Sequence, residues 1–560
     1  MKMNGAQIVV ELLCAHGATT VFGYPGGSVL PIYDELYKNA DRIHHVLTAH
    51  EQGAAHAADG YARTAGRPGV VIATSGPGAT NLVTGIANAY LDSVPMVAIT
   101  GNVAVPLLGR DSFQEVDIVG ITQPIVKHSF EVREVEKLED ILNEAFHIAD
   151  SGRRGPVLVD IPKSVQTDVC EYLGKPPLKK EKKRPRAFDL EHIAKIIAEC
   201  KRPFIYAGGG VIAGGAEAEL RSLSELLSAP VGLSMMGMTA LPCDYGLNLG
   251  MCGMHGKYAA TIAQSECDVM IALGVRFSDR ATGNTDIFKQ KKTIIHVDID
   301  LAEIGKNVST QIDVCGDVKE VLTELLKIIG PMRQEQWLAR IEALKQVTIS
   351  RDTGGQNNPQ GIINAIGRHC DDDTVIVTDV GQHQIWVMQY CKFQKPRTLL
   401  TSGGLGAMGF GLGAAIGSCM ANDKKRTVLF TGDGSFGMNL IELATAVSQK
   451  LPIVIIILNN NALGLPRQWQ GMFHKGRYSQ STLDRKTDFA SLAKAFGARG
   501  HSAATLFELE EIMAELPDGL PVVIDCKIDM DEKAFPMIPP GGSVKNMVRE
   551  GGKYHGTIHS

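Results

Sequence analysis

Short apolar runs alternate with amphipathic stretches along most of the chain. Apolar runs occupy 70–73, 96–100, 203–207, 269–273, 293–298, 375–378, 427–430, 453–458 and 522–526. Glycines or polar residues follow each run, and helical patterns separate the runs. This alternation is typical of parallel sheets whose strands are connected through helices. The pattern therefore predicts an α/β protein built from doubly wound parallel sheets.

Two polar stretches interrupt the alternation and divide the chain into three units. The first contains Pro176-Pro177 and a run of basic residues, and the second ends in Gly-Gly-Gln-Asn-Asn-Pro at 354–359. At roughly 100–200 residues per domain, 560 residues also favour three domains. The predicted organisation is domains 1–167, 189–340 and 359–535, linkers 168–188 and 341–358, and a C-terminal tail at 536–560.

The composition is that of an ordinary globular protein, with 44% hydrophobic and 21% charged residues. The net charge of −5 gives no electrostatic reason to expect nucleic acid or an anionic membrane as a partner. The 11 cysteines show no CxxC pair and no zinc-type spacing, which favours reduced thiols. We find no signal peptide and no apolar run of about 18 residues, so the cytoplasm is the predicted location. A mature organellar protein would have the same sequence features.

The strongest chemical signal is Gly-Asp-Gly at 432–434 followed by Asn459-Asn460. Each motif follows a predicted strand, and a helix is predicted at 438–450 between them. Ligands bind at strand ends of open parallel sheets, and a helix N-terminus presents N–H groups to phosphate. Asp and Asn oxygens suit Mg²⁺ that bridges a diphosphate. Either motif alone is typical of a turn, but together they are similar to the signature of thiamine-diphosphate enzymes.

Glu51 is the second candidate for catalysis. It stands before small residues at a predicted strand-to-helix junction, where the helix dipole alone would favour an acid. In thiamine-diphosphate enzymes a glutamate engages the aminopyrimidine ring of the cofactor and promotes loss of its C2 proton. The resemblance therefore implies that Glu51 is catalytic.

From about residue 3 to about 548 the chain resembles the catalytic large subunit of the acetohydroxyacid synthase (acetolactate synthase) family. The motifs that carry this resemblance lie in all three units, at 21–27, 73–81, 113–115, 160–163, 208–210, 253–256, 275–277, 404–409 and 468–470. The resemblance implies a pyrimidine-binding, a central FAD-binding and a diphosphate-binding domain. It also implies thiamine diphosphate, Mg²⁺ and a non-redox FAD as cofactors, and an active site between two chains of a homodimer or tetramer.

The activity that this resemblance implies is decarboxylation of pyruvate and transfer of the two-carbon unit. The acceptor would be a second pyruvate or 2-ketobutyrate, which gives 2-acetolactate or 2-aceto-2-hydroxybutyrate for valine, leucine and isoleucine synthesis. The usual partner in the family is a small regulatory subunit. The alternatives are a sister enzyme such as a pyruvate oxidase or FAD-free synthase, or a flavoprotein that has lost carboligation.

Matching this sequence to the motifs of the family assigns residues to the metal, the cofactor and the substrates. Mg²⁺ would be held by Asp433, Asn460 and the Ala462 carbonyl. Thiamine diphosphate would contact Pro25, Glu51, Ser75, Asn81, Gln382, His383, Gly406, Gly434 and Ser435, with Met408 wedged beneath it. The substrate channel would contain Gly26, Phe113, Gln114 and Lys163. Trp469 would lie against the second keto acid, and Arg276 would pair with its carboxylate.

The implied FAD residues are Arg153, Gly208, Gly209, Gly210, Met236, Met254, His255, Gly256, Val275, Arg276, Asp298 and Asp317. The chain departs from the family pattern at Ser278, at Leu465-Pro466, at Gly413 and at Arg110. Ser278 replaces an aspartate and is expected to weaken FAD binding, and Pro466 is expected to stiffen the loop before Trp469. Gly413 and Arg110 replace a proline and a threonine.

Overall fold

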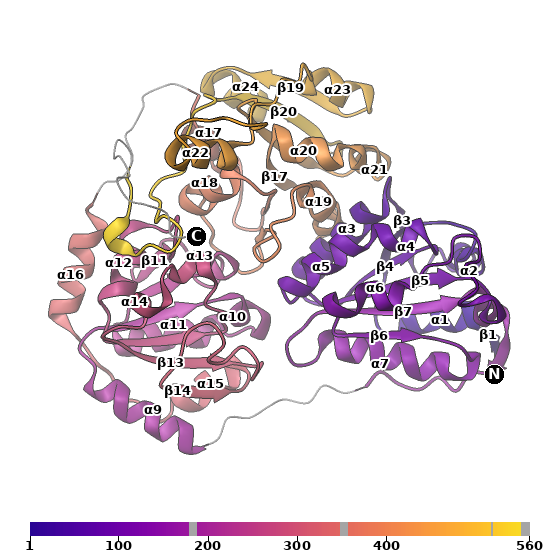
Figure 1. The fold of residues 1–560 in the computed structure, drawn as a ribbon, viewed down its shortest axis with the longest axis horizontal. Helices are drawn as coiled ribbons and strands as arrows, with labels where there is room; N and C mark the ends of the chain where they lie inside the picture. The colour runs from indigo at the N-terminus through magenta and orange to yellow at the C-terminus, as the bar shows by residue number, and fades with distance from the viewer. Residues whose placement is uncertain (179–186, 348–356, 517–518, 550–560) are drawn as a thin grey trace.

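The computed structural model describes residues 1–178, 187–347, 357–516 and 519–549. Parts of both predicted linkers and of the tail, at 179–186, 348–356 and 550–560, lie outside the described residues. Figure 1 shows three sheet-containing units, with the C-terminal unit lying above and between the other two. The predicted α/β fold with three doubly wound parallel sheets is confirmed.

The first sheet has six parallel strands in the order β3-β2-β4-β5-β7-β6. Its strands are β2 (Thr20–Tyr24), β3 (His44–Leu47), β4 (Gly69–Ala73), β5 (Met96–Asn102), β6 (His128–Glu131) and β7 (Pro156–Pro162). Its helices are α1 (Gly5–Ala15), α2 (Leu30–Lys38), α3 (Glu51–Ala65), α4 (Pro77–Asn81), α5 (Val83–Leu91), α6 (Ile118–Thr122), α7 (Leu138–Asp150) and α8 (Lys163–Thr167). Outside this sheet, β1 (Lys2–Asn4) pairs antiparallel with β8 (Val169–Glu171).

The central sheet has the order β11-β10-β9-β12-β13-β14. Its strands are β9 (Pro203–Ala207), β10 (Val231–Leu233), β11 (Asn248–Met251), β12 (Val269–Leu273), β13 (Thr293–Asp298) and β14 (Ile312–Cys315). Its helices are α9 (Ala187–Glu199), α10 (Gly209–Gly214), α11 (Glu217–Leu227), α12 (Tyr258–Glu266), α13 (Asp279–Thr282), α14 (Thr285–Phe288), α15 (Val318–Leu325) and α16 (Glu335–Lys345).

The third sheet has the order β16-β15-β17-β18-β20-β19. Its strands are β15 (Val375–Thr378), β16 (Leu399–Leu400), β17 (Thr427–Gly432), β18 (Ile453–Asn459), β19 (Arg499–Ala503) and β20 (Val522–Lys527). Its helices are α17 (Pro359–Gly367), α18 (Gln382–Tyr390), α19 (Phe410–Ala421), α20 (Asp433–Asn439), α21 (Leu443–Ser448), α22 (Gly464–Phe473), α23 (Phe489–Ala495) and α24 (Leu506–Ala514).

The strand orders locate the ligand-binding edges. In the first and third sheets, the first strand in chain order lies beside the third. The chain therefore leaves these two strands toward opposite edges of the sheet, at β2 and β4 in the first sheet and at β15 and β17 in the third. In the central sheet the connections diverge between β9 and β12. Open parallel sheets bind ligands in the crevice at the carboxyl ends of such strands. Each sheet therefore offers one crevice whose position follows from topology alone.

Helices α3 and α19 join the first and third units through a common core (Figure 1). Alanines and glycines face each other, and a Cβ added to Gly60 or Gly417 would collide with the carbonyl oxygen of Ala414 or Ala57. The helix backbones are therefore in direct contact, which only glycine at these positions allows. Gly413 also lies here, because a Cβ on it would be 2.7 Å from the Cβ of His56.

Two local predictions were wrong. The helix predicted at 438–450 begins earlier, because Asp433 is already the first residue of α20 and a second short helix, α21, follows. Pro466 does not lie in a loop but in the first turn of α22. A proline fits there because the N–H groups of the first turn have no partner within the helix.

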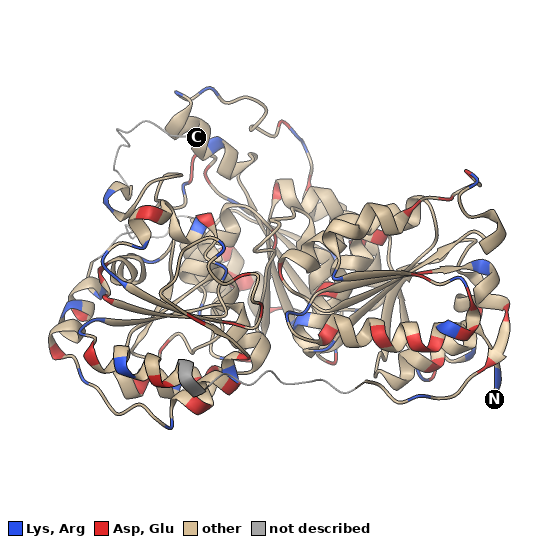
Figure 2. Ribbon diagram, turned by 60° about the horizontal axis from the view of Figure 1, so that its bottom comes forward, with Lys and Arg blue, Asp and Glu red and all other residues tan. Residues whose placement is uncertain are grey.

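Acidic and basic residues are interspersed on the outer helices, and the strands carry few of either (Figure 2). All 11 cysteines are free. Within the described part of the chain, no helix combines the length and apolar character that crossing a bilayer requires.

The contact between α3 and α19 yields a stability prediction. We expect Gly417→Ala to lower the free energy of unfolding by about 1–3 kcal/mol, because the added methyl group forces the two helices apart. Gly367→Ala is the control, since Gly367 ends α17 and a Cβ there would meet no atom within 4 Å. Chemical denaturation monitored by circular dichroism would measure both. Equal stabilities of the two variants would contradict the prediction.

Candidate functional site

The carboxyl ends of β17 and β18 bring the predicted metal residues together. Gly432 pairs with Leu458 in the sheet, so Asp433 and Asn460 follow neighbouring strands. Asp433 is buried, and this burial raises the pKa of its carboxyl to about 6. The side-chain oxygen of Asn460 accepts the N–H of Ala462 at 3.1 Å.

Gln382 and His383 begin α18 at the neighbouring strand β15 and are both buried. The Nε2 atom of Gln382 donates a hydrogen bond to the Oε1 atom of Gln468 (2.9 Å). The Oε1 atom of Gln382 has no hydrogen-bond partner among the described residues. The Nε2 atom of His383 also lacks a partner there, and burial lowers the pKa of this imidazole to about 3. A Cβ on Gly464 would collide with Gln382 and lie 3.1 Å from Asn460 Nδ2, which shows that these side chains converge.

The turn that carries Met408 reaches the same crevice. A Cβ on Gly434 would be 3.7 Å from the Cε atom of Met408. Gly406 has a φ of +69°, a conformation that favours glycine. Ser435 donates its hydroxyl to the Val380 carbonyl (2.7 Å), so it also connects α20 to the end of β15.

Two aspartates that the sequence analysis missed hold this turn at both ends. Asp92 accepts the N–H groups of Gly403 (3.1 Å) and Gly404 (2.7 Å). Asp379 accepts the N–H of Gly409 (2.8 Å), and burial raises the pKa of its carboxyl to about 6. The position of Asp379 directly after β15 was a usable signal, whereas nothing local in the sequence marks Asp92.

The residues at this crevice fit a metal-bound diphosphate. Asp433 and Asn460 provide oxygens of the kind that Mg²⁺ prefers, and the unpartnered atoms of Gln382 and His383 are buried polar groups that a ligand would satisfy. The residues that the structure brings together here are Gln382, His383, Met408, Asp433, Gly434, Ser435, Asn460 and Ala462.

Glu51 lies at the corresponding crevice of the first sheet. It begins α3, and its carboxylate accepts a hydrogen bond from Asn81 at 2.9 Å. Nearby, the N–H of Ser75 donates to the Ser28 hydroxyl (2.9 Å), and Gly26 packs against Thr74. Pro25 and Gly26 follow β2, and Ser75 follows β4, so these predicted residues flank the divergence point of the sheet.

The predicted channel residues lie at the rim of the first unit. Phe113 is 88% exposed, and Gln114 and Lys163 are also exposed. A Cβ on Gly76 would lie 2.8 Å from the carbonyl oxygen of Gln114, so Gln114 adjoins the loop after β4. Among the described residues of one chain, no hydrogen bond or ion pair connects Glu51 or Asn81 with Asp433 or Asn460.

The central sheet has the strand order typical of dinucleotide-binding folds. Gly208, Gly209 and Gly210 follow β9 at the divergence point, as predicted for a flavin site. They also pack on the protein itself, because a Cβ on Gly210 would be 2.6 Å from the Cα atom of Gly274. A Cβ on Gly209 would be 3.1 Å from Met236. These glycines therefore allow close backbone packing at the crevice as well as space for a ligand.

Arg280 is a functional candidate that the sequence analysis missed. Its guanidinium lies 5.4 Å from the ring centre of Trp469 and donates to the sulfur of Met254 at 3.8 Å. Arg276, the predicted carboxylate partner, is half-buried, and its carbonyl accepts a hydrogen bond from Asn307. Arg280 belongs to the Phe-Ser-Asp-Arg segment noted for Ser278, but no local pattern shows its contact with Trp469.

Other predicted flavin residues have structural partners. Arg153 pairs with Glu303 (2.6 Å) and Asp300 (3.3 Å), so it connects the first and central units. Asp317 caps α15 by accepting the N–H groups of Lys319 and Glu320. Burial raises the pKa of Asp298 to about 6. The carbonyl of Val275 is a hydrogen-bond partner of His296.

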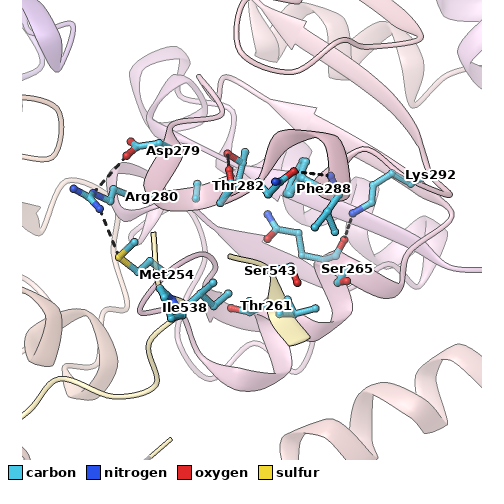
Figure 3. A pocket seen from close by; sticks show the side chains of 17 residues that line it. Met254, Thr261, Ser265, Asp279, Arg280, Thr282, Phe288, Lys292, Ile538 and Ser543 are labelled. Atoms are coloured by element: carbon cyan, nitrogen blue, oxygen red, sulfur yellow. Dashed lines mark hydrogen bonds and ion pairs between the residues drawn. The ribbon is translucent and has the colours of Figure 1, made fainter. Parts of the chain in front are cut away.

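The chain after β20 covers one side of the central unit. The N–H of Ile538 donates to the carbonyl of Met254 (2.8 Å), and His255 hydrogen-bonds to the carbonyl of Pro536 (3.1 Å). A Cβ on Gly256 would be 2.6 Å from the Met251 carbonyl oxygen. Figure 3 shows the pocket beneath this segment, which includes Met254 and Arg280 in its lining and encloses about 40 Å³.

Comparison with known proteins identifies the family. Three thiamine pyrophosphate enzyme models match, namely the N-terminal TPP binding domain at residues 3–121, the central domain at 190–325 and the C-terminal TPP binding domain at 379–526. A probable acetolactate synthase large subunit of Methanocaldococcus jannaschii is 44% identical over 98% of this chain and 95% of its own length. The acetolactate synthase isozyme 1 large subunit of Escherichia coli is 43% identical over 98% of both chains.

These matches agree with the resemblance found in the sequence, which is thereby confirmed. They also cover the two crevices described above, because the N-terminal match includes Glu51 and the C-terminal match includes Asp433. The chain belongs to the thiamine pyrophosphate enzymes and, within them, to the acetolactate synthase large-subunit family.

Proposed function

We propose that this protein is a thiamine-diphosphate- and Mg²⁺-dependent acetolactate synthase. It decarboxylates pyruvate and joins the two-carbon unit to a second pyruvate or to 2-ketobutyrate, the first common step of branched-chain amino acid synthesis. The observation that carries this proposal is the convergence of Asp433, Asn460 and the unpartnered atoms of Gln382 and His383 at one crevice, in a chain of this family.

The active site lies between two chains in this proposal. Glu51 and Asp433 occupy the crevices of different sheets, and a catalytic glutamate must reach the cofactor held at the other crevice. Large apolar side chains close to both groups in the sequence are exposed in a single chain, among them Leu47 (52%) and Met438 (56%). Their exposure in a single chain supports at least a homodimer, since exposed apolar surface of this kind marks interaction sites.

The roles of the residues follow from their positions. Asp433, Asn460 and the Ala462 carbonyl would hold Mg²⁺, Gln382 and His383 would contact the diphosphate, and Met408 would support the bound cofactor. When bound, thiamine diphosphate supplies the electron sink for decarboxylation. Glu51 would exchange a proton with the aminopyrimidine ring, and Asn81 orients its carboxyl group through a hydrogen bond of 2.9 Å.

Trp469 and Arg280 form the acceptor site. The ring of Trp469 provides an apolar surface for the extra methyl group of 2-ketobutyrate, a contact worth about 1–3 kcal/mol. The guanidinium of Arg280 lies over that ring and can bind a carboxylate through two hydrogen bonds. We therefore assign to Arg280 the role that the sequence analysis gave to Arg276.

FAD binds the central unit in this proposal and performs no net redox. The strand order and the glycines after β9 support a dinucleotide at this crevice. Because the relatives are called large subunits, a small regulatory subunit is the proposed partner. The small net charge of −5 and the free cysteines support a cytoplasmic location without nucleic acid as a partner.

The decisive experiment measures acetolactate formation from pyruvate, with and without 2-ketobutyrate and FAD. We expect Glu51→Gln to reduce kcat at least about 100-fold, because the amide cannot exchange a proton with the cofactor. Glu335→Gln is the control, since Glu335 also begins a helix, α16, but its side chain is 71% exposed. Near-normal acetolactate output from Glu51→Gln, or acetyl phosphate and peroxide as the main products, would refute the proposal.

Arg280 and Arg276 can be separated by matched substitutions. We expect Arg280→Gln to lower kcat/KM for the acceptor about 10- to 100-fold, because hydrogen bonds to a charged group are lost. Arg276→Gln should have a much smaller effect on this constant. Competition between pyruvate and 2-ketobutyrate measures the acceptor step for each variant. The reverse ranking of the two variants would return the role to Arg276.

The pKa of Asp433 predicts how metal binding depends on pH. The folded pKa of about 6 lies above the ordinary 3.8, so protons compete with Mg²⁺ once the pH falls below about 6. Affinity for Mg²⁺ should then fall about tenfold per pH unit, as for any ligand that must be deprotonated. Calorimetry with Mg²⁺ and thiamine diphosphate between pH 5 and pH 8 measures it. Asp433→Asn should bind weakly with little dependence on pH, and an unchanged slope in this variant would contradict the assignment.

A further inference from the structure

Glu442 of the third unit is a fully buried carboxylate that contacts the first unit. It ends a short 3₁₀ helix (Leu440–Glu442) that follows α20, and none of its surface is exposed. Its two oxygens accept the N–H groups of His50 (2.9 Å) and Ala49 (3.1 Å). The hydroxyl of Thr445 donates a third hydrogen bond at 2.7 Å. All three donors therefore converge on one carboxylate.

The two backbone donors directly precede Glu51. His50 is the N-cap residue of α3, and Glu51 is the first residue of that helix. The bonds to Glu442 therefore fix the backbone at the point where α3 begins. From the other side, Asn81 donates to the Glu51 carboxylate at 2.9 Å. Glu51 is thus held through its backbone by one unit and through its side chain by another helix.

The surroundings leave room for this carboxylate and little else. A Cβ on Gly53 would collide with Glu442, so the glycine at this position permits the contact. A buried carboxylate needs full hydrogen bonding, and here backbone N–H groups of the neighbouring unit supply it. The arrangement is costly if its only purpose is packing, because an apolar side chain would fill the same space without a buried charge.

We propose that Glu442 is a positioning residue that sets the location of the Glu51 carboxylate at the cofactor crevice. This inference rests on the proposed role of Glu51. Glu442 touches neither substrate nor cofactor and acts only through the backbone of Ala49 and His50. Since α20 begins at Asp433 and leads to Glu442, the segment that holds the metal ligand also holds the start of α3.

The test substitutes Glu442→Gln, which keeps the size of the side chain but presents an NH₂ group to one of the two N–H donors. Deuterium exchange at C2 of bound thiamine diphosphate reports the action of Glu51 directly. We expect this rate and kcat to fall about 10- to 100-fold, as for a small displacement of a catalytic group. KM for pyruvate should stay within about twofold, because the substrate contacts are unchanged. Glu51→Gln sets the lower limit of the exchange rate.

Glu139→Gln is the matched control. Glu139 is also buried and accepts two backbone N–H groups, from Leu173 (3.0 Å) and Lys175 (2.6 Å), but it lies on α7 away from Glu51. This variant should exchange C2 deuterium at the wild-type rate. Should Glu442→Gln fail to fold, Thr445→Val removes one bond to the same carboxylate and should slow exchange by a smaller factor.

The outcomes distinguish this inference from the proposed function. Wild-type C2 exchange in folded, cofactor-loaded Glu442→Gln, or an equal loss in Glu139→Gln, would overturn the positioning role alone. A wild-type protein that binds thiamine diphosphate without accelerating C2 exchange would overturn the proposed function and this inference with it. Faster hydrogen exchange of the amides at 49–50 in Glu442→Gln, measured by mass spectrometry, would support the loss of the two backbone bonds.

Discussion

The direct backbone contact between α3 and α19 is the constraint on which the arrangement of the sites depends. Gly60 and Gly417 let the two helices approach until main-chain atoms touch, and the surrounding alanines extend one core across the first and third units. Interiors packed this closely have discrete arrangements and resist small shifts. The start of α3, and with it Glu51, is therefore placed by the third unit as much as by its own sheet. Glu442 acts at the end of this same contact.

The same strand order in the first and third sheets gives the two crevices equivalent positions. In both sheets, predicted residues follow the first and third strands of the sheet in chain order, which are β2 and β4 in one sheet and β15 and β17 in the other. Glu51 follows β3, and Asn460 follows β18. The sequence nevertheless shows no short repeat. The two sheets can share a strand order without one, because topology depends on which strands pair and not on the identity of their residues. A parallel sheet places all strand ends at one edge, so a polar motif after each strand suffices to build a site. The central sheet has a different order and places its glycines at a different divergence point.

Much of the fold could be predicted because buried parallel strands are continuous apolar runs. The runs at 203–207, 269–273 and 293–298 coincide with β9, β12 and β13. The start of α20 could not be predicted in this way, because Gly-Asp-Gly has the composition of a turn although it forms the first turn of a helix. Arg280, Asp92 and Glu442 were missed for another reason. Each acts through a contact with a distant segment, namely Trp469, the turn at 403–404 and the start of α3, and local patterns contain no such information.

Arg153 was predicted to bind the flavin, and in the structure it also connects the first unit with the central unit. It belongs to the first unit, and its partners Asp300 and Glu303 follow β13 of the central unit. A flavin phosphate near Arg153 would compete with these carboxylates for one guanidinium, since an ion pair and a phosphate contact use the same N–H donors. Flavin binding would then weaken a bond between the two units while adding contacts within the central one. Because the first unit is also held by α19, its position would change little. The side chains of Asp300 and Glu303 would lose their ion-pair partner, whereas Glu51 would stay in place.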